Sequence, residues 1–430
     1  MKKIKIIGGG LAGCEAALQL AENGWKVKLF EMRPAVQTEA HQSGNLAELV
    51  CSNSLKSKLQ TTASGLLKEE LKFLGCKLLP IAEKCSVPAG NALAIDREKF
   101  AQKVTKICQS HPNIEVIREE ISKLDDELTI VATGPLTSAK LTHELIQIIG
   151  NKHLYFFDAI APIVATDSLD FSKIYRKTRY DKGDADYLNC PFSEEEYYDF
   201  VDALNSAEKH TAKEFETHFF ADIKFQFYAN CTPIEELARR GKDTLRFGVM
   251  RPVGLEDPKT DKRPFAVIQL RTEKNDKTSH NLVGCQTMLK YGEQKRILRK
   301  IPGLENAEFL RFGSIHRNTY LNGPQILNEN LSLKNKPNIF IAGQLAGVEG
   351  YVESIFGGLL ISKIIIENFQ KLPQTTIAGQ LWRHLVTAQK NFQPMNANFG
   401  LLPPLAERER DKKIKKQKYA IRAIKDLTEM

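Results

Sequence analysis

The sequence predicts an α/β fold in which a mostly parallel sheet carries an α+β insertion and the chain ends in a basic C-terminal helical segment. Three observations lead to this prediction. A glycine-rich turn separates a strand from a helix at the N-terminus. Two further apolar strands that end in glycine follow near residues 134 and 343. The long segment between them differs in composition, which indicates an insertion into one sheet.

The N-terminal segment has the element order of a Rossmann-type dinucleotide-binding motif. Ile4, Ile6 and Ile7 predict a short buried strand, and a helix is expected over residues 11–23. A second strand, expected at 25–30, ends in Glu31, which lies 18 residues beyond Gly13. An acid at about this spacing binds ribose hydroxyls, while the glycines and the helix N-terminus face the pyrophosphate. The expected cofactor contacts are Gly8, Gly9, Gly10, Leu11, Ala12, Gly13 and Glu31.

The same letters allow a second interpretation. Leu11-Ala12-Gly13-Cys14, after three early lysines, resembles the lipobox of a bacterial lipoprotein. A signal peptide needs an apolar stretch of roughly 7–15 residues. The stretch after Lys5 is nearly half glycine, so the dinucleotide interpretation is favoured.

Two late strands favour FAD over a plain nicotinamide cofactor. Residues 128–132 form an apolar run that leads into Gly134, and residues 338–342 form another that stops at Gly343. A helix is expected from Gly357 to Asn368. In two-dinucleotide flavoproteins, a late strand, glycine and helix close the flavin site. The expected contacts here are Gly134, Gly343, Gln344, Gly347, Gly350 and Tyr351.

The middle and the end of the chain differ from this nucleotide-binding pattern. The expected division is a Rossmann-type FAD-binding domain in two parts, 1–168 and 326–430, around an insertion domain at 169–325. Within the insertion, an acidic-aromatic helix is expected at 192–200 and strands at 265–270 and 282–285. Residues 407–425 hold nine Lys or Arg against three acids. A helical apolar stripe of Ile414, Ala420, Ile421, Ile424 and Leu427 predicts either a helix docked by one face or a surface for RNA phosphates.

The totals exclude several classes of protein. The 430 residues contain 42% hydrophobic and 26% charged residues, with no uninterrupted apolar run of about 18, so no membrane span is expected. The net charge of +9 permits a polyanionic partner. Eight scattered cysteines without a CxxC pair predict reduced thiols, a cytoplasmic location and no metal site. The sequence leaves the oligomeric state open, with a homodimer as one option.

Nine colinear stretches, spread from end to end, carry a resemblance to a known family. They are residues 8–13, 47–55, 65–70, 237–241, 244–248, 301–309, 316–320, 347–354 and 391–402. Together they resemble the TrmFO family of folate- and FAD-dependent uridine-5-methyltransferases, relatives of the longer GidA tRNA-modifying proteins. The resemblance implies transfer of a one-carbon unit from 5,10-methylenetetrahydrofolate to C5 of a uridine in RNA. FAD and NADPH or NADH would supply the reducing equivalents.

The resemblance also implies roles for particular residues. C5 of uracil becomes nucleophilic only after a thiolate adds to C6, and Cys231 matches the position of that nucleophile. Pro233 suggests that a helix starts nearby, and its amides would lower the pKa of the thiol. Cys51 matches the base that removes the C5 proton. His316 matches the imidazole that stacks on the folate, and Arg317 and Asn318 are further candidates for folate contacts.

The substrate side of the pattern departs from the family. Tyr228-Ala229-Asn230-Cys231 stands where Phe-Glu-Gly-Cys is usual. The RNA is therefore open between the T-loop uridine of tRNA and a uridine of ribosomal RNA. Two other functions remain: a flavoprotein that oxidises NAD(P)H or handles folate without RNA, and a non-catalytic protein that binds FAD and RNA. The first would have a dispensable Cys231, and the second would bind RNA without turnover.

Overall fold

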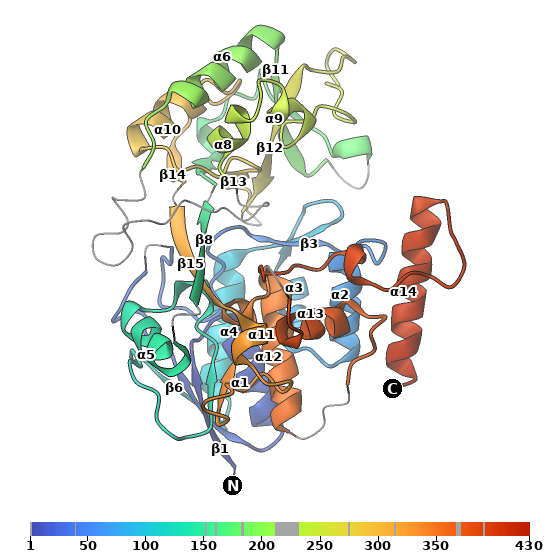
Figure 1. The fold of residues 1–430 in the computed structure, drawn as a ribbon. Helices are drawn as coiled ribbons and strands as arrows, with labels where there is room; N and C mark the ends of the chain where they lie inside the picture. Colours follow the sequence, from blue (N-terminus) through green and yellow to red (C-terminus); the bar gives the residue numbers. More distant parts are fainter. Residues whose placement is uncertain are drawn as a thin grey trace.

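The computed structural model has two lobes joined by a two-stranded ribbon (Figure 1). It describes residues 2–38, 40–150, 153–159, 161–181, 185–210, 232–273, 276–313, 315–366, 371–389 and 392–430. Each lobe has its own hydrophobic core. We call them the nucleotide lobe, which contains both termini, and the upper lobe.

A five-stranded parallel sheet forms the centre of the nucleotide lobe. Its order is β16 (Ile339–Ile341), β7 (Thr129–Val131), β1 (Lys3–Ile7), β2 (Lys26–Phe30) and β6 (Ile114–Ile117). The central strands are apolar on both faces, and Ile6, Leu29 and Ile130 have no exposed surface. Strands from the two ends of the sequence therefore share one sheet, as an insertion requires.

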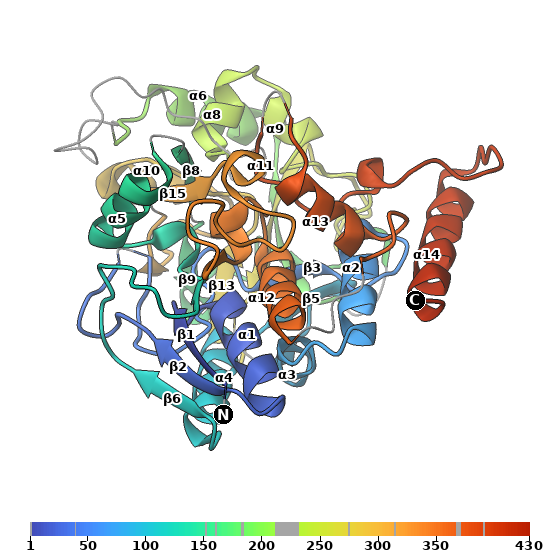
Figure 2. The ribbon, with the colours of Figure 1, turned by 60° about the horizontal axis from the view of Figure 1, so that its bottom comes forward.

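Helices α1 (Leu11–Glu22) and α12 (Tyr351–Ile365) lie side by side against this sheet (Figures 1 and 2). Glycines permit the close approach, because a Cβ on Gly358 would stand 2.1 Å from the carbonyl oxygen of Ala12. The expected start of the late helix at residue 357 is wrong. The helix begins six residues earlier, after Gly350 at φ 120°, and Gly357 and Gly358 pack inside it against Gly343 and Ala12.

The remaining elements of this lobe cover the sheet and build a small second sheet. The helices are α2 (Ala63–Phe73), α3 (Leu78–Lys84), α4 (Arg97–Ser110), α5 (Ala139–Ile149), α11 (Gly323–Ile326) and α13 (Ile377–Val386). The small sheet has the order β3 (Ser54–Ser57), β5 (Ala92–Ile95), β4 (Ser86–Val87). Cys14 lies inside α1 with no exposed surface.

The upper lobe is a six-stranded sheet with helices. The strand order is β10 (Tyr175–Arg176), β11 (Tyr187–Phe192), β12 (Ala266–Thr272), β13 (Ser279–Leu282), β9 (Ile163–Ala165) and β14 (Phe309–Arg311). Its helices are α6 (Glu194–Ser206), α8 (Ile234–Arg239), α9 (Thr244–Phe247) and α10 (Tyr291–Leu298). Strand β9 precedes the expected boundary at residue 169 but pairs with β13, so it belongs to this sheet.

Two expected elements of the upper lobe differ in extent. The strand expected at 282–285 is β13, which ends at Leu282 because Gly284 turns the chain at φ 79°. The helix expected at 192–200 is α6, which starts at Glu194 because Ser193 caps it with a capping box. Phe192 belongs to β11 instead.

Strands β8 (His153–Ala159) and β15 (Ile315–Leu321) pair antiparallel and form the ribbon between the lobes (Figure 1). Among the described residues, no helix has both the length and the apolar content to cross a membrane.

The tail forms helix α14 (Lys412–Thr428) at one side of the nucleotide lobe (Figure 1). The helix is as expected, and its apolar stripe is confirmed in part. Ala420 and Leu427 are buried as expected, together with Tyr419 and Ala423, whereas Ile414 and Ile421 are 43% and 69% exposed. Tyr419 stacks on Phe399, which rotates the docked face away from the two isoleucines.

Candidate functional site

The carboxyl ends of four parallel strands meet at one edge of the five-stranded sheet. The Gly8 amide donates to the carbonyl of Phe30 at 2.8 Å, and the Ala132 amide donates to Ile7 at 2.8 Å. The Ala342 amide donates to Val131 at 2.9 Å. These bonds join the glycine turn to the ends of β2, β7 and β16, which is the edge where α/β sheets bind nucleotides.

The three glycines of the motif have different physical roles. Gly8 has φ 105°, and a Cβ there would stand 2.6 Å from the Ala132 oxygen. A Cβ on Gly13 would stand 1.9 Å from the oxygen of Gly8. A Cβ on Gly10 would meet nothing within 4 Å. Gly8 and Gly13 are therefore required by the turn itself, whereas Gly10 leaves an open side where a pyrophosphate can approach the backbone. The turn fits a dinucleotide.

Glu31 lies directly below this turn, at the end of β2, and is 5% exposed. Its Oε2 accepts from the Gly9 amide at 3.0 Å and from Arg33 Nη2 at 3.1 Å. Its Oε1 accepts from Arg33 Nε at 2.9 Å and from the Arg33 amide at 3.0 Å. Burial acts to raise the pKa of Glu31, but the bonds and charge of Arg33 outweigh it and lower the pKa. A ribose hydroxyl would therefore have to share or displace one of four donors.

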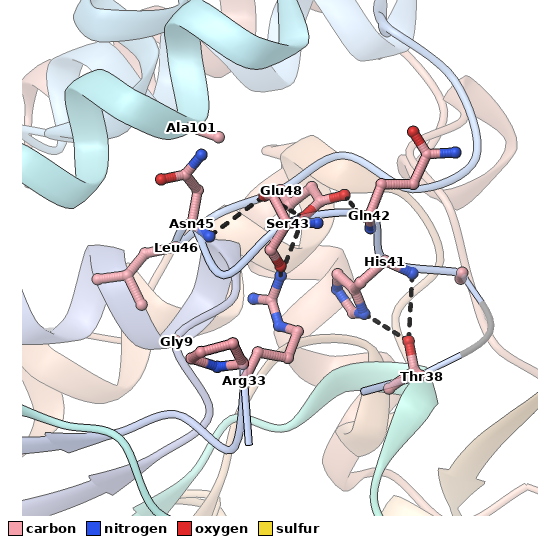
Figure 3. A network of polar contacts seen from close by, with 12 residues as sticks. Gly9, Arg33, Thr38, His41, Gln42, Ser43, Asn45, Leu46, Glu48 and Ala101 are labelled. Atoms are coloured by element: carbon pink, nitrogen blue, oxygen red, sulfur yellow. Dashed lines mark hydrogen bonds and ion pairs between the residues drawn. The ribbon is translucent and has the colours of Figure 1, made fainter. Parts of the chain in front are cut away.

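Arg33 connects Glu31 to a second acid, Glu48. Figure 3 shows Arg33 and Glu48 with the loop that follows His41. The Arg33 side chain is 2% exposed, and its Nη1 donates to Glu48 Oε2 at 3.0 Å. Glu48 in turn accepts from the amides of Gln42 and Ser43, at 2.8 and 3.1 Å. This network fixes the loop of residues 42–48 over the nucleotide turn.

A pocket opens beside this network. Its wall includes Gly8, Gly10, Glu31, Arg33, His41, Thr133, Thr137 and Ser138. Burial, together with the charge of Arg33, lowers the pKa of His41 to about 4, so the imidazole is neutral at pH 7. The pocket thus offers hydroxyls, backbone amides and a neutral ring around the end of β2, which suits an adenosine ribose better than a further cation.

The other expected cofactor contacts fall into two groups. Gly134, at φ 64°, and Gly343, at φ 67°, lie at the sheet edge after β7 and β16. Gly343 also packs on Ala12, because a Cβ there would stand 2.9 Å from the Cβ of Ala12.

The second group precedes α12 and makes contacts within the protein. A Cβ on Gly347 would stand 2.3 Å from the ring of Phe392, and one on Gly350 would stand 2.2 Å from Glu353 Oε2. Gln344 Nε2 donates to Glu349 Oε2 at 2.6 Å. Packing alone therefore accounts for the two glycines of this turn.

Cys51 is half-buried on a loop that both lobes hold in place. The hydroxyl of Tyr351 accepts from the amides of Cys51 and Ser52, at 2.8 and 3.1 Å. From the upper lobe, Arg271 donates to Asn53 Oδ1 at 2.7 Å and to Ser52 Oγ at 3.0 Å. Burial, with the Cys51 charge, raises the pKa of Tyr351, so the phenol stays protonated. The loop that carries the thiol is thus positioned by the start of α12 and the end of β12.

Charged residues that the sequence analysis did not select surround this loop. Arg97 donates from Nε to Glu273 Oε2 at 2.8 Å and from Nη1 to the Leu49 oxygen at 3.2 Å. Arg311 lies close enough to Cys51 and Tyr351 for their charges to act on its pKa, which burial and Arg97 lower. Arg97, Glu273 and Arg311 line a cavity of about 410 Å³ between the lobes. A signal was present, because Arg271 and Glu273 interrupt the apolar pattern where β12 ends.

The remaining four expected site residues are Cys231, which the sequence analysis assigns as the nucleophile, and the three expected folate contacts. Cys231 lies outside the described residues, and the chain is described again from Thr232, two residues before α8 begins. His316, Arg317 and Asn318 lie on β15, where their backbones pair with Asp158, Phe157 and Phe156 of β8. The expected folate residues are thus on the ribbon between the lobes. No group of His, Cys, Asp and Glu among the described residues could hold a metal ion.

Comparisons with known proteins agree with this arrangement. Residues 3–372 match the family described as glucose inhibited division protein A, or GIDA. The chain is 51% identical over 430 residues to the methylenetetrahydrofolate–tRNA-(uracil-5-)-methyltransferase TrmFO of Halalkalibacterium halodurans, covering 99% of this chain and 97% of that protein. It is 50% identical to the protein of the same name from Bacillus subtilis, with the same coverage. The structure of Aquifex aeolicus GidA superimposes with a TM-score of 0.69 at 16% identity, over 99% of this chain and 73% of that one.

Proposed function

The chain belongs to the GidA family and, within it, to the TrmFO methyltransferases, and we propose on this premise how its residues perform the reaction. It is a folate-dependent tRNA (uracil-5-)-methyltransferase, which places a methyl group on C5 of a uracil. The observation that carries the proposal is the junction of the lobes, where one cavity is lined by Glu48, which binds Arg33, and by Leu49, two residues before Cys51.

FAD fits the edge of the parallel sheet. The turn of Gly8, Gly10 and Gly13 would hold the pyrophosphate, and the pocket beside Glu31 would hold the ribose. Gly343 and the start of α12 would face the flavin end. When bound, FAD supplies the reducing equivalents and the carrier for the one-carbon unit, and NADPH or NADH restores it.

Two cysteines carry out the steps at the uracil. The Cys231 thiolate adds to C6, which places the electron pair on C5, and C5 then bonds to the one-carbon unit from methylenetetrahydrofolate as the bond from that carbon to its carrier nitrogen breaks. Cys51 takes the C5 proton, and the electrons left on C5 expel Cys231. The reducing equivalents that FAD would supply convert the methylene on C5 to a methyl group. The Cys51 loop is held for this role by Tyr351 and Arg271, whose bonds fix the backbone and the neighbouring side chains.

The upper lobe holds the other substrates. His316, Arg317 and Asn318 of β15 bind the folate between the lobes. The insertion, expected at residues 169–325, meets the RNA, and the target uridine is flipped out to reach the cavity. The uridine is in the T-loop of tRNA, with ribosomal RNA as the alternative target.

The proposal is tested by nucleoside mass spectrometry on RNA treated with the purified protein. The reaction contains FAD, methylenetetrahydrofolate and NADPH, with unmodified tRNA and ribosomal RNA in separate tubes. We expect 5-methyluridine in tRNA, and none with Cys231→Ala. Cys190→Ala is the matched control, because Cys190 is a fully buried cysteine of the upper lobe. Equal methylation by Cys231→Ala would refute the assigned nucleophile, and absence of methylation in both RNAs would refute the activity.

A further inference from the structure

The upper lobe carries an exposed aromatic surface that the proposed chemistry does not use. Phe247, at the end of α9, is 74% exposed. Val249, two residues further along the chain, is 37% exposed, and Tyr180, whose neighbour Arg179 binds the oxygen of Arg251, is 53% exposed. We call Tyr180, Phe247, Val249 and Arg251 the Phe247 platform. A cluster of exposed rings on a folded lobe indicates an interaction site.

The platform is held rigidly from below. Leu245 is buried, and the Arg246 guanidinium lies 3.8 Å from the centre of the Phe265 ring and 5.3 Å from that of Phe247. The Tyr180 amide donates to the oxygen of Gly254 at 2.9 Å. The neighbouring Arg179 donates from Nη2 to the oxygen of Arg251, also at 2.9 Å. Because its supports are already formed, the platform would lose little conformational freedom on binding a ligand.

The surroundings of the platform are positively charged. Residues 239–251 contain five Lys or Arg and one acid, which gives a net charge of +4. Arg251 is exposed, and no acidic side chain in the described part of the chain pairs with its guanidinium. In a symmetric dimer the same patch meets itself, so two such segments would repel each other. An exposed ring close to Arg251 instead suits an unstacked base and a phosphate of RNA.

The platform lies near the reacting groups. The amide of Val267 on β12 donates to the oxygen of Met250 at 3.0 Å, beside the platform. Four residues further along the same strand, Arg271 holds the Cys51 loop. At about 3.3 Å per residue, the two points are about 13 Å apart. Helix α8, which precedes α9 in the sequence, begins at Ile234, three residues after Cys231.

We propose that the Phe247 platform binds a base that neighbours the target uridine of the RNA substrate, and that Arg251 contacts an adjacent phosphate. The inference rests on the proposed function for the identity of the RNA. One nucleotide would stack on Phe247 while the flipped uridine enters the cavity between the lobes.

The test measures binding and catalysis separately. Binding of an unmodified tRNA transcript is followed by fluorescence anisotropy, and methylation gives kcat and KM for the same transcript. Phe247→Ala should weaken binding and raise KM for tRNA about tenfold, because a stacked base is lost. Phe247→Trp should restore binding, since it keeps a flat ring. The KM for folate and the rate of flavin reduction by NADPH should not change.

Charge and stacking give different salt dependences. Arg251→Gln should reduce the slope of log affinity against log salt by about 0.7, the value for one phosphate contact on a single strand. Phe247→Ala should leave that slope unchanged. Phe171→Ala is the matched control, because Phe171 is an exposed ring of the same lobe, 47% accessible, outside the platform.

Three outcomes would overturn the inference. They are unchanged tRNA binding in Phe247→Ala, an equal loss in Phe171→Ala, or a dimer that Phe247→Ala dissociates. The last would make the platform a subunit interface. If the wild-type protein binds tRNA through Phe247 but does not methylate it, the inference stands and the proposed activity fails. If the wild-type protein and Phe247→Ala methylate tRNA with the same KM, the proposed activity stands and the inference fails.

Discussion

Arg33 offers the sharpest test of how the nucleotide edge is held together. Its guanidinium lies between Glu31 and Glu48, and the exposed fractions of the three side chains are 2%, 6% and 12%. Arg33→Met keeps the length of the side chain and removes its charge. Two buried carboxylates then lose their shared partner. Breaking a buried ion pair in this way costs about 3–5 kcal/mol of stability.

The pH dependence of this loss follows from the pKa of Glu31. In the wild type the pKa of Glu31 is lowered by Arg33. The ion pair therefore stabilises the fold fully at pH values above the pKa that Glu31 has in the unfolded chain. That stabilisation is lost as the pH falls through the pKa of Glu31 in the folded protein. In Arg33→Met, the bonds and charge of Arg33 are absent, so burial raises the pKa of Glu31. The variant then gains stability relative to the wild type as pH falls. The difference should be largest near pH 8 and smaller near pH 5.

Urea titration of the flavin-free proteins at the two pH values measures this difference. Lys140→Met is the control, because its ion pair with Glu120 lies on the surface, with Lys140 70% exposed, and contributes at most about 1 kcal/mol. The double variant Arg33→Met with Glu31→Gln should recover part of the loss. A loss below about 1 kcal/mol at pH 8, or one that does not shrink at pH 5, would refute the reasoning.

Three further predictions concern other parts of the molecule. Gly10→Ala should fold normally but retain less flavin. Gly13→Ala should lose both stability and flavin, because its Cβ would stand 1.9 Å from the Gly8 oxygen. The flavin absorbance per protein and a thermal melt measure the two effects. Burial, with the charges of Arg176 and Lys277, lowers the pKa of His280 to about 4, so its neutral ring should cost the fold roughly 3 kcal/mol as pH falls from 6.5 to 4. His280→Gln should remove this loss from the pH profile of unfolding, and an unchanged profile would contradict the assignment. Lys412 and Lys416 of α14 are exposed and have no acidic partner among the described residues, so changing both to Glu should raise KM for tRNA at low salt and leave flavin reduction unchanged. The same change at Lys371, which already pairs with Glu329, should have less effect on KM.

The local pattern of the sequence predicted the nucleotide edge well. Gly8, Gly10 and Gly13 follow a buried strand, and few other backbone structures fit that order of residues. The tail was harder, because a helical period identifies the helix but not which side docks. Ile414 and Ile421 are apolar and exposed, and the docked side was decided by the packing of Tyr419 on Phe399.

The start of α12 shows the same limit in another form. The helix was expected to start at Gly357. Gly357 and Gly358 instead lie inside it, although glycine weakens isolated helices, because only glycine allows α12 to approach Gly343 and Ala12 so closely. A neighbouring element that is distant in the sequence overrode the local preference.

The sequence by itself determined the parallel sheet, the glycine turn with Glu31 and the presence of an insertion, because these depend on residues near one another in the chain. Only the tertiary structure decided that Arg33 supplies three of the four hydrogen bonds to Glu31, that Arg271 and Tyr351 fix the Cys51 loop, and that Arg97, Glu273 and Arg311 share one cavity. The partners in these contacts come from segments up to 300 residues apart. Charges and hydrogen bonds act between groups that are close in space, so these contacts form only in the folded protein, where the two lobes meet.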